Sequence, residues 1–311
     1  MKRFKNISIT FLIFLIHAKV AYSRKQLRIN GGEKTPDGRY PFMVSLQHKK
    51  GHFCGGAIID ENSILTAAHC VTEEKTGKFT KKQIYAVLGT SDAGNKGREV
   101  QVLKIKIKKM YKPKAYTPLN PHPGLPFQRP ADIAVLKLEE PIQLEHNEVH
   151  LPQLEKINLP TDPDAQYMGE KLIIAGYGES GNKREELRFA YAKVLTNGEC
   201  VSKYKLNVRQ DHFCAQMSQR KPHRPEGTCD GDSGGPLFDS KTKTVKGVLS
   251  TGPVDCNENK TPSVYTKVSQ FLYFIRAAIN DKATDDADCV EWKKSTGCTH
   301  CTHKLVDCTK N

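Results

Sequence analysis

Long apolar runs are almost absent from this 311-residue sequence, which limits how the chain can meet a membrane. The clearest run, residues 7–16, has ten residues and is too short to span a bilayer. No later stretch is long and apolar enough to cross one, so we expect a soluble chain without a membrane partner. Acidic residues are also absent from residues 1–28, which hold seven of the 48 lysines and arginines.

This amino-terminal segment has the layout of an export signal. Basic residues within the first five positions precede the apolar run, and Ala21 and Ser23 supply small residues at the −3 and −1 positions of a cleavage site. We therefore expect residues 1–23 to be a signal peptide and the protein to be secreted into the extracellular space. An uncleaved anchor is the alternative, which the short apolar run disfavours.

The sequence has no repeat of fixed period, and only a moderate excess of basic charge beyond the export signal. Without residues 1–28, 41 basic residues face 34 acidic ones, a net charge of +7. In the basic run at residues 104–109 lysine largely alternates with isoleucine, as in a strand with one solvated face. We expect such a strand rather than a nucleic-acid or heparin site, because charge runs are weak signals of binding.

Short β-type runs separated by turn residues dominate the chain. They are residues 42–47, 56–59, 84–88, 133–138, 171–175 and 245–249. Many short strands with glycine and proline turns indicate an all-β barrel or sandwich. Strong helical spacing occurs only at residues 267–280, where one face carries Val268, Phe271, Leu272, Ile275 and Ile279. We expect this face to pack against the β body.

Two segments differ from the rest in composition. Residues 113–130 contain six prolines, which a central strand cannot hold, so we expect a surface loop. Residues 281–311 are polar and too few to bury a core without crosslinks. In an exported protein we expect two disulfides there, of undetermined connectivity, with a zinc site as the alternative; the four cysteines are Cys289, Cys298, Cys301 and Cys308.

Three patches together hold the groups needed for amide hydrolysis. His69 lies beside a cysteine in LTAAHC, Asp132 begins the run DIAVLKL, and Ser233 lies among glycines in GDSGGP. An imidazole can take the serine proton during attack, and a carboxylate can orient that imidazole. Each patch alone is a weak signal, but the three together are not.

With these patches, in the order His, Asp, Ser, the chain resembles the trypsin/chymotrypsin family of serine proteases. The resemblance covers about residues 29–280 and includes INGG, VSLQ, CGG, LTAAHC, DIAVLKL, GYG, GDSGGP and PSVYTKV. It implies a fold of two six-stranded antiparallel β-barrels with a C-terminal helix, and an active site between the barrels. A protease domain at residues 29–280 would then precede a Cys-rich extension at residues 281–311. We expect no metal and no cofactor.

The resemblance implies a role for each residue of the site. His69 would act as general base and acid, Asp132 would orient it, and Ser233 would attack the substrate. The amides of Gly231 and Ser233 would form the oxyanion hole. The Ser250 hydroxyl would support the aspartate, and its backbone would pair with the substrate. Three disulfides carry over in the same way: Cys54–Cys70, Cys200–Cys214 and Cys229–Cys256.

Activation by proteolysis at Arg28-Ile29 is implied as well. Cleavage by a trypsin-like protease would release residues 24–28 as a propeptide and free the amino group of Ile29. In the family this group pairs with the acid before the serine, here Asp232, because a buried cation needs a close partner. Asn30 departs from the valine usual at this junction.

The substrate pocket lacks the aspartate that trypsin-like members carry six residues before the serine. Gly227 stands there, next to Thr228, and the pocket walls correspond to Gly252 and Ser263. A buried basic side chain without a partner is costly, so we expect an uncharged medium or large P1 residue such as Leu, Met, Phe or Tyr. Glu226 is the neighbour whose carboxylate a one-residue shift would bring into the floor.

Other features would modify this site. The hydroxyls of Thr228 and Ser263 suit a hydrogen-bonding substrate side chain. Asp230 would lie at the rim and repel acidic substrate residues. The proline-rich segment is either a stiff lid over the cleft or a harmless insertion. Residues 90–100 hold few acids, which disfavours calcium.

The sequence thus predicts a secreted zymogen of a serine endopeptidase. Its partners would be protein or peptide substrates, an activating trypsin-like protease and protein inhibitors. A non-catalytic homologue that acts by binding is the alternative. Such a homologue would normally have a broken triad, and the three residues are intact here.

Overall fold

The computed structural model describes residues 29–94, 102–118, 129–144, 152–178, 186–205, 208–218, 226–282, 286–293 and 304–308. Several sequence-based predictions fall outside the described residues. They concern the signal peptide, the propeptide with Arg28, residues 95–100, residues 119–128 of the proline-rich segment, Cys298 and Cys301. None of the described helices is long and apolar enough to cross a membrane.

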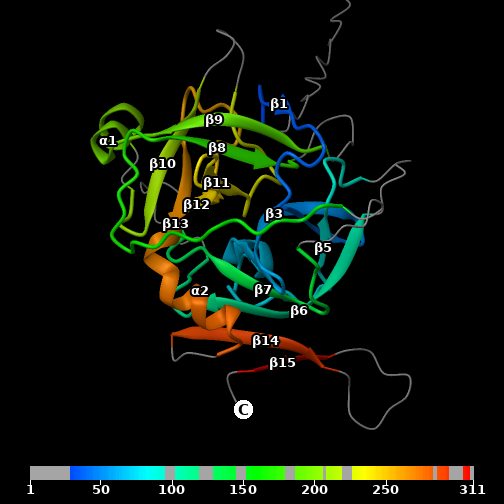
Figure 1. The fold of residues 1–311 in the computed structure, drawn as a ribbon. Helices are drawn as coiled ribbons and strands as arrows, with labels where there is room; N and C mark the ends of the chain where they lie inside the picture. Colours follow the sequence, from blue (N-terminus) through cyan, green and yellow to red (C-terminus); the bar gives the residue numbers. More distant parts are fainter. Residues whose placement is uncertain are drawn as a thin grey trace, which may run out of the picture.

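Two closed antiparallel barrels form the body, which confirms the predicted fold (Figure 1). The first barrel has the strand order β6-β5-β2-β3-β4-β7, and β6 pairs with β7 to close it. The bounds of its strands are β2 Met43–His48, β3 Gly51–Asp60, β4 Ser63–Thr66, β5 Tyr85–Leu88, β6 Leu103–Pro113 and β7 Ala134–Leu138.

The second barrel has the order β9-β10-β13-β12-β11-β8, closed by pairing of β8 with β9. Its strands are β8 Lys171–Gly176, β9 Arg188–Val194, β10 His212–Met217, β11 Pro236–Asp239, β12 Thr244–Thr251 and β13 Ser263–Lys267. The two-residue strand β1 Glu33–Lys34 adds to the outer side of β9. Every β-type run expected from the sequence overlaps one strand of the two barrels.

The C-terminal helix packs where its apolar face predicts. A 3-10 turn, η2 Val268–Phe271, leads into α2 Leu272–Ile279, whose buried residues include Phe274 and Ile275. Lys137 of β7 fixes this contact: its Nζ donates to the carbonyl of Ile279 at 2.8 Å and to Ser63 Oγ at 2.9 Å. A cation at a helix C-terminus satisfies carbonyls that the helix leaves unpaired.

A second helix, α1 Asn197–Tyr204, was not predicted. It has eight residues, too few for a convincing apolar period. Its local signal is a capping box, in which Thr196 Oγ1 accepts from the Glu199 amide at 3.1 Å and Glu199 Oε2 accepts from the Thr196 amide at 2.7 Å.

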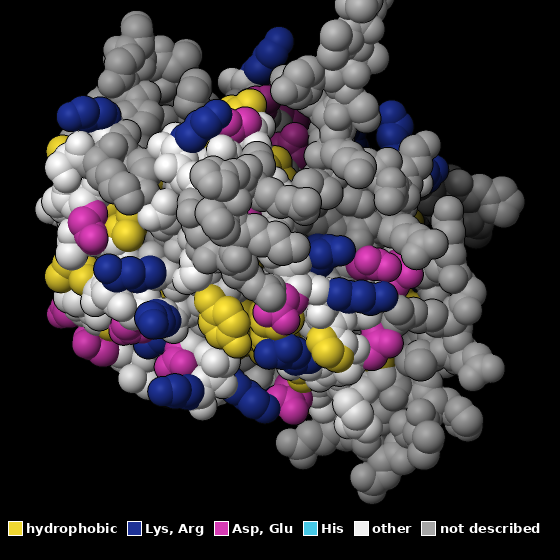
Figure 2. Space-filling view, turned by 90° about the horizontal axis from the view of Figure 1, so that it is seen from above, with side chains coloured by type: hydrophobic (Ala, Val, Ile, Leu, Met, Phe, Trp, Pro, Cys, Tyr) yellow, Lys and Arg dark blue, Asp and Glu magenta, His cyan; other side chains and the backbone are white. Residues whose placement is uncertain are grey.

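The basic run forms part of β6, as predicted, with Lys104, Lys106 and Lys108 exposed on one face. Two of these lysines pair with acids: Lys106 with Glu139 at 3.8 Å and Lys108 with Glu291 at 3.8 Å. On the face seen in Figure 2, the described basic and acidic side chains are interspersed. The ion pairs of Lys106 and Lys108 are typical of a solvated strand face.

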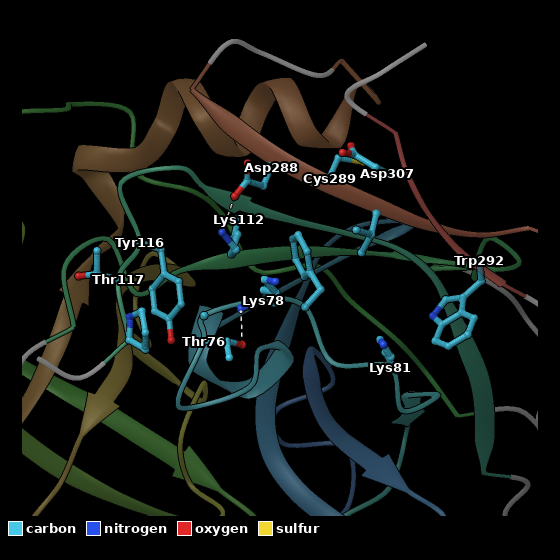
Figure 3. A pocket seen from close by; sticks show the side chains of 14 residues that line it. Thr76, Lys78, Lys81, Lys112, Tyr116, Thr117, Asp288, Cys289, Trp292 and Asp307 are labelled. Carbon is cyan, nitrogen blue, oxygen red and sulfur yellow. Dashed lines mark hydrogen bonds and ion pairs between the residues drawn. The ribbon is translucent and has the colours of Figure 1, made fainter.

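The cysteine-rich extension continues the sheet of the first barrel. Strand β14 Ala287–Lys293 pairs antiparallel with β6, and β15 Lys304–Asp307 pairs with β14, below α2 in Figure 1. A disulfide joins Cys289 to Cys308. A groove of about 860 Å³ lies between β14 and two loops of the barrel (Figure 3). Its lining includes Lys78, Phe79, Lys112, Tyr116 and Trp292.

Candidate active site

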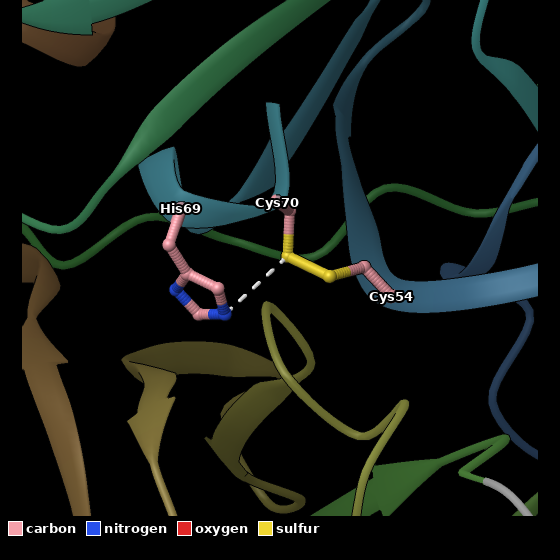
Figure 4. A group of neighbouring side chains, drawn as sticks. All are labelled: Cys54, His69 and Cys70. Carbon is pink, nitrogen blue, oxygen red and sulfur yellow. Dashed lines mark hydrogen bonds between the residues drawn. A yellow bond between two sulfur atoms is a disulfide. The ribbon is translucent and has the colours of Figure 1, made fainter. Parts of the chain in front are cut away.

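His69 lies in a short 3-10 turn, η1 Ala68–Val71, directly after β4. The next residue, Cys70, is bonded to Cys54 of β3 (Figure 4), which fixes the turn to the barrel. The His69 amide donates to Asp132 Oδ1 at 2.9 Å, and its Nδ1 lies 2.7 Å from Asp132 Oδ2. Since a carboxylate only accepts, Nδ1 carries the proton and Nε2 is left as the acceptor.

The ligand-type atoms of Cys54, His69 and Cys70 lie within 4.8 Å of one another, a spacing that would suit a metal ion. Both sulfur atoms belong to one disulfide, with His69 Nε2 at 3.8 Å from Cys70 Sγ (Figure 4). A cysteine binds a metal as a thiolate, so Cys54 and Cys70 cannot hold a metal while their disulfide is formed.

Asp132 precedes β7 and is fully buried. Its Oδ2 also accepts a hydrogen bond from Ser250 Oγ at 2.6 Å. Burial alone would raise the pKa of this carboxyl, but the charge of His69 and the hydrogen bond from it, followed by Arg129 and Ser250, hold the pKa below its usual range. The carboxylate therefore stays ionised and can stabilise an imidazolium at His69.

The Ser233 loop is held against β3, whose Cys54 is bonded to Cys70, the residue after His69. The amide of Gly55, next to Cys54, donates to the Ser233 carbonyl at 2.7 Å, and the Gly234 amide donates to the Leu249 carbonyl at 2.8 Å. Within the described chain no hydrogen bond joins Ser233 to His69. In enzymes without substrate, this type of contact is often long and tightens on binding.

Two amides of this loop are available to a ligand. In the described part of the chain, the amides of Gly231 and Ser233 donate to no other group. His52, which sequence reasoning missed, braces the loop: its Nε2 lies 2.9 Å from the Gly231 carbonyl and its Nδ1 lies 2.8 Å from Ser45 Oγ. A single histidine in a strand forms no sequence pattern, so the sequence could not indicate this contact.

Ile29 and Asp232 meet in the interior, both fully buried. The Ile29 nitrogen donates to Asp232 Oδ2 at 3.2 Å, while the Cys229 and Gly178 amides donate to the same carboxylate at 2.9 Å each. The next residue, Asn30, forms two backbone hydrogen bonds with Gly227, of 2.6 and 3.0 Å. The start of the described chain is thus connected to both the Ser233 loop and the expected pocket floor.

The four expected pocket residues lie together. Thr228 Oγ1 and Ser263 Oγ are 2.6 Å apart, and a methyl group at Gly252 would overlap Thr228 Oγ1, so the walls approach closely here. Cys229, beside Thr228, is bonded to Cys256, and Cys200 to Cys214, as expected. Asp230 is exposed at the turn before Gly231.

Glu226 does not reach this pair of hydroxyls, since its side chain lies against Gly31. Glu258 does, and sequence reasoning missed it. Its Oε1 accepts from Ser263 Oγ at 2.6 Å and from the Thr228 amide at 3.1 Å, and Oε2 accepts from the Met217 amide at 2.5 Å. Burial raises the pKa of Glu258 to about 7, although these hydrogen bonds act to lower it.

Comparison with known proteins identifies the family. The family model for trypsin matches residues 29–275. The chain belongs to the trypsin family. It is 30% identical over 272 residues to the clotting factor G β subunit of Tachypleus tridentatus, covering 80% of this chain and 78% of that protein.

Solved structures of the trypsin fold agree with the two-barrel architecture. Neuropsin, a serine protease expressed in the limbic system of mouse brain, is 23% identical with a TM-score of 0.63, covering 80% of this chain and 98% of that one. Human heparin binding protein is 24% identical with a TM-score of 0.61, covering 82% and 98%. At these identities the likeness concerns the fold alone.

Proposed function

We propose that this trypsin-family protein is a secreted serine endopeptidase with His69, Asp132 and Ser233 as its catalytic triad. One observation carries the proposal: hydrogen bonds run from Ser250 through the buried Asp132 to His69 Nδ1, beside the Ser233 loop. An ordered base next to a serine among available amides is the arrangement that acyl transfer needs.

In this mechanism His69 Nε2 takes the proton of Ser233 Oγ as the oxygen attacks the carbonyl carbon of the scissile peptide bond. The amides of Gly231 and Ser233 stabilise the negative charge on the carbonyl oxygen, each by about 3 kcal/mol. His69 then passes its proton to the leaving amine, which departs and leaves an acyl-enzyme. Water, deprotonated by His69, attacks the ester and releases the acid and Ser233.

Activation follows from the contact between Ile29 and Asp232. In the intact chain the Ile29 nitrogen is an amide, and cleavage after Arg28 converts it to an ammonium group. An ion pair with Asp232 would then strengthen a contact that already connects to the Ser233 loop through Cys229. Residues 24–28 would be the propeptide, cut by a trypsin-like protease.

Export and domain organisation belong to the same proposal. The described chain has four disulfides, which persist in oxidising compartments such as the extracellular space. Residues 1–23 would direct the chain there, with residues 29–280 as the protease domain and residues 281–311 as the extension. Protein or peptide substrates and protein inhibitors are its expected partners.

The P1 residue expected from Gly227, uncharged and medium or large, stays a prediction, as does repulsion of acidic substrate residues by Asp230. The first prediction follows from Gly227 alone, and the Glu258 side chain lies close to Gly227.

A serine-reactive fluorophosphonate probe tests the proposed function. Ser233 should be labelled after the secreted chain is cut by trypsin and not before. Arg28→Gln should stay unlabelled after the same treatment, while Lys25→Gln, a matched change within the propeptide, should be labelled like the wild type. A chain that begins at Ile29 and still leaves Ser233 unlabelled would refute it.

A non-catalytic binding protein is the second candidate, favoured by two close contacts at the positions expected to bind substrate. Arg129 Nη1 donates to the Ser250 carbonyl at 3.1 Å, and Gly252 lies against Thr228. A cleft that stays closed in this way would admit no substrate, and the same labelling experiment would then give no signal in the cleaved chain.

A further inference from the structure

Glu258 lies behind the pocket that would receive the P1 side chain. Its side chain is 1% exposed, and no lysine, arginine or histidine of the described chain forms an ion pair with it. Gly227 leaves room for it, because a Cβ at position 227 would lie 3.0 Å from Glu258 Cγ. A carboxylate at this end of the pocket thus comes from position 258 instead of position 227.

Two hydroxyls connect this carboxylate to the pocket. Because an ionised carboxylate only accepts, Ser263 must donate its proton to Glu258 Oε1 at 2.6 Å. The Ser263 oxygen then accepts from Thr228 Oγ1, 2.6 Å away. Both hydroxyl protons are directed toward Glu258, so each oxygen offers only lone pairs to a group that enters from the pocket.

We propose that Glu258 is a specificity-determining residue that makes this pocket select P1 side chains ending in a hydrogen-bond donor, lysine and arginine first. The inference rests on the proposed function. Pocket oxygens that can only accept hydrogen bonds satisfy a side chain that ends in a donor. The negative charge of Glu258 behind them attracts a cation. An apolar side chain gains neither interaction and removes water from both hydroxyls.

The preference should depend on pH, because burial raises the pKa of Glu258 to about 7. Tyr265 of β13 faces Glu258, but burial raises its pKa well above 10, so it stays neutral. Asp232 is engaged by Ile29, and the carbonyl of Glu226 accepts from the Glu258 amide at 2.8 Å. On the same loop, exposed Lys260 and Asp255 pair with each other at 2.9 Å. The charge that changes near neutral pH is therefore that of Glu258.

Hydrolysis of peptides that differ only at P1 tests the inference in the cleaved chain. At pH 8, kcat/KM should be at least about tenfold higher for lysine than for norleucine, and for arginine than for leucine, with citrulline in between. The ratio of lysine to norleucine should fall several-fold at pH 5.5. Taking a ratio cancels the pH dependence of the catalytic step, which is common to both substrates.

Three variants separate a role in selection from a structural role. Glu258→Gln should lower the ratio of lysine to norleucine about tenfold and remove the pH dependence of that ratio. Glu258→Asp should keep part of the ratio, because it keeps the charge. Glu226→Gln, the matched buried glutamate on the Gly31 side, should keep all of it. If Glu258→Gln fails to fold, the pH dependence of the lysine-to-norleucine ratio in the wild type still tests the role of Glu258.

Benzamidine binding separates this inference from the proposed function. Titrated into cleaved Ser233→Ala protein at pH 8, benzamidine should bind at least about tenfold more tightly than neutral benzamide, and the difference should shrink at pH 5.5. If benzamidine binds in this way but the cleaved wild type hydrolyses no peptide, the proposed function is refuted and the role of Glu258 is not. Fastest hydrolysis at Leu, Met or Phe, with no preference for benzamidine, would overturn the role of Glu258 and support the expectation from Gly227.

Discussion

Arg129 Nη1 donates a hydrogen bond to the carbonyl oxygen of Ser250 at 3.1 Å and lies 3.4 Å from Thr251 Oγ1. By the resemblance to the family, the backbone of Ser250 is the one that pairs with a bound substrate. In that role of Ser250 the chain would occupy its own substrate position, and a peptide would have to displace Arg129 before it could form the same hydrogen bond.

Arg129→Ala should lower KM about three- to tenfold and change kcat little, because substrate no longer replaces a hydrogen bond worth about 1 kcal/mol. Steady-state kinetics of the cleaved chain measures both constants. Arg276→Ala, on the exposed side of α2, is the matched control and should behave like the wild type. A higher KM for Arg129→Ala would mean that this arginine binds substrate instead of competing with it.

Asp132→Asn should lower kcat about 10⁴-fold, because an amide can no longer hold His69 in the tautomer that accepts the serine proton. A second Asp–His pair provides the control: Asp211 Oδ1 lies 2.9 Å from His212 Nδ1, outside the proposed triad. Asp211→Asn should change kcat by less than about tenfold, since it touches no reacting group. Equal losses in the two variants would remove Asp132 from its proposed role.

Asp232→Asn should prevent activation even when the chain is fully cut after Arg28. The new amino group would have no carboxylate to pair with, and a buried unpaired cation costs about 3–5 kcal/mol. Labelling of Ser233 by the fluorophosphonate probe, with cleavage verified by mass, measures the effect. Asp230→Asn, two residues away and exposed, should activate normally. Full labelling of Asp232→Asn would contradict this activation mechanism.

The features that could be predicted from the sequence have local signals. Runs such as residues 133–138 show their strands by β-branched and apolar composition, and α2 shows its apolar face by spacing. The two-barrel fold and the paired cysteines came from the family resemblance, which needs only short motifs. The capping box at Thr196 was also local, but apolar spacing does not detect it.

The features that could not be predicted depend on contacts between distant parts of the chain. Glu258 is 30 residues from Thr228 and 41 from Met217, the two residues whose amides hold its carboxylate. Arg129 is 121 residues from Ser250. A single charged residue in a polar loop carries no pattern, so its role appears only when folding brings its partners together. For this reason the triad was expected and the chemistry of the pocket floor was not.

Glu258 should make the wild type less stable as the pH rises through 7. The pKa of its carboxyl is about 7 in the folded protein and 4.5 ordinarily, so the folded state binds the proton more tightly. The tighter proton binding stabilises the folded state by about 3 kcal/mol. This stabilisation is fully present below about pH 4.5 and is lost as the pH rises through 7. In thermal unfolding of the uncut chain from pH 5 to 8.5, the Tm of the wild type should therefore fall relative to that of Glu258→Gln. Glu226→Gln should follow the wild type, and parallel curves for the wild type and Glu258→Gln would contradict the assignment.

Two lysine–aspartate ion pairs with similar N–O distances should contribute differently to the free energy of unfolding, because one is half-buried and the other is exposed. Lys112 Nζ lies 2.5 Å from Asp288 Oδ2 of β14, and its side chain is 7% exposed between the rings of Phe79 and Tyr116. Asp288→Asn leaves that ammonium without a charged partner and should lower the free energy of unfolding by about 1–2 kcal/mol.

The control for this change is Asp255→Asn, which removes the 2.9 Å pair with Lys260, whose side chain is 70% exposed. It should cost less than about 0.5 kcal/mol, because solvent screens such a pair. Urea unfolding of the uncut chain measures both variants under one condition. A larger loss for Asp288→Asn would mean that the extension is held to β6 by this ion pair as well as by backbone hydrogen bonds, and equal losses would mean that strand pairing and the Cys289–Cys308 disulfide hold it alone.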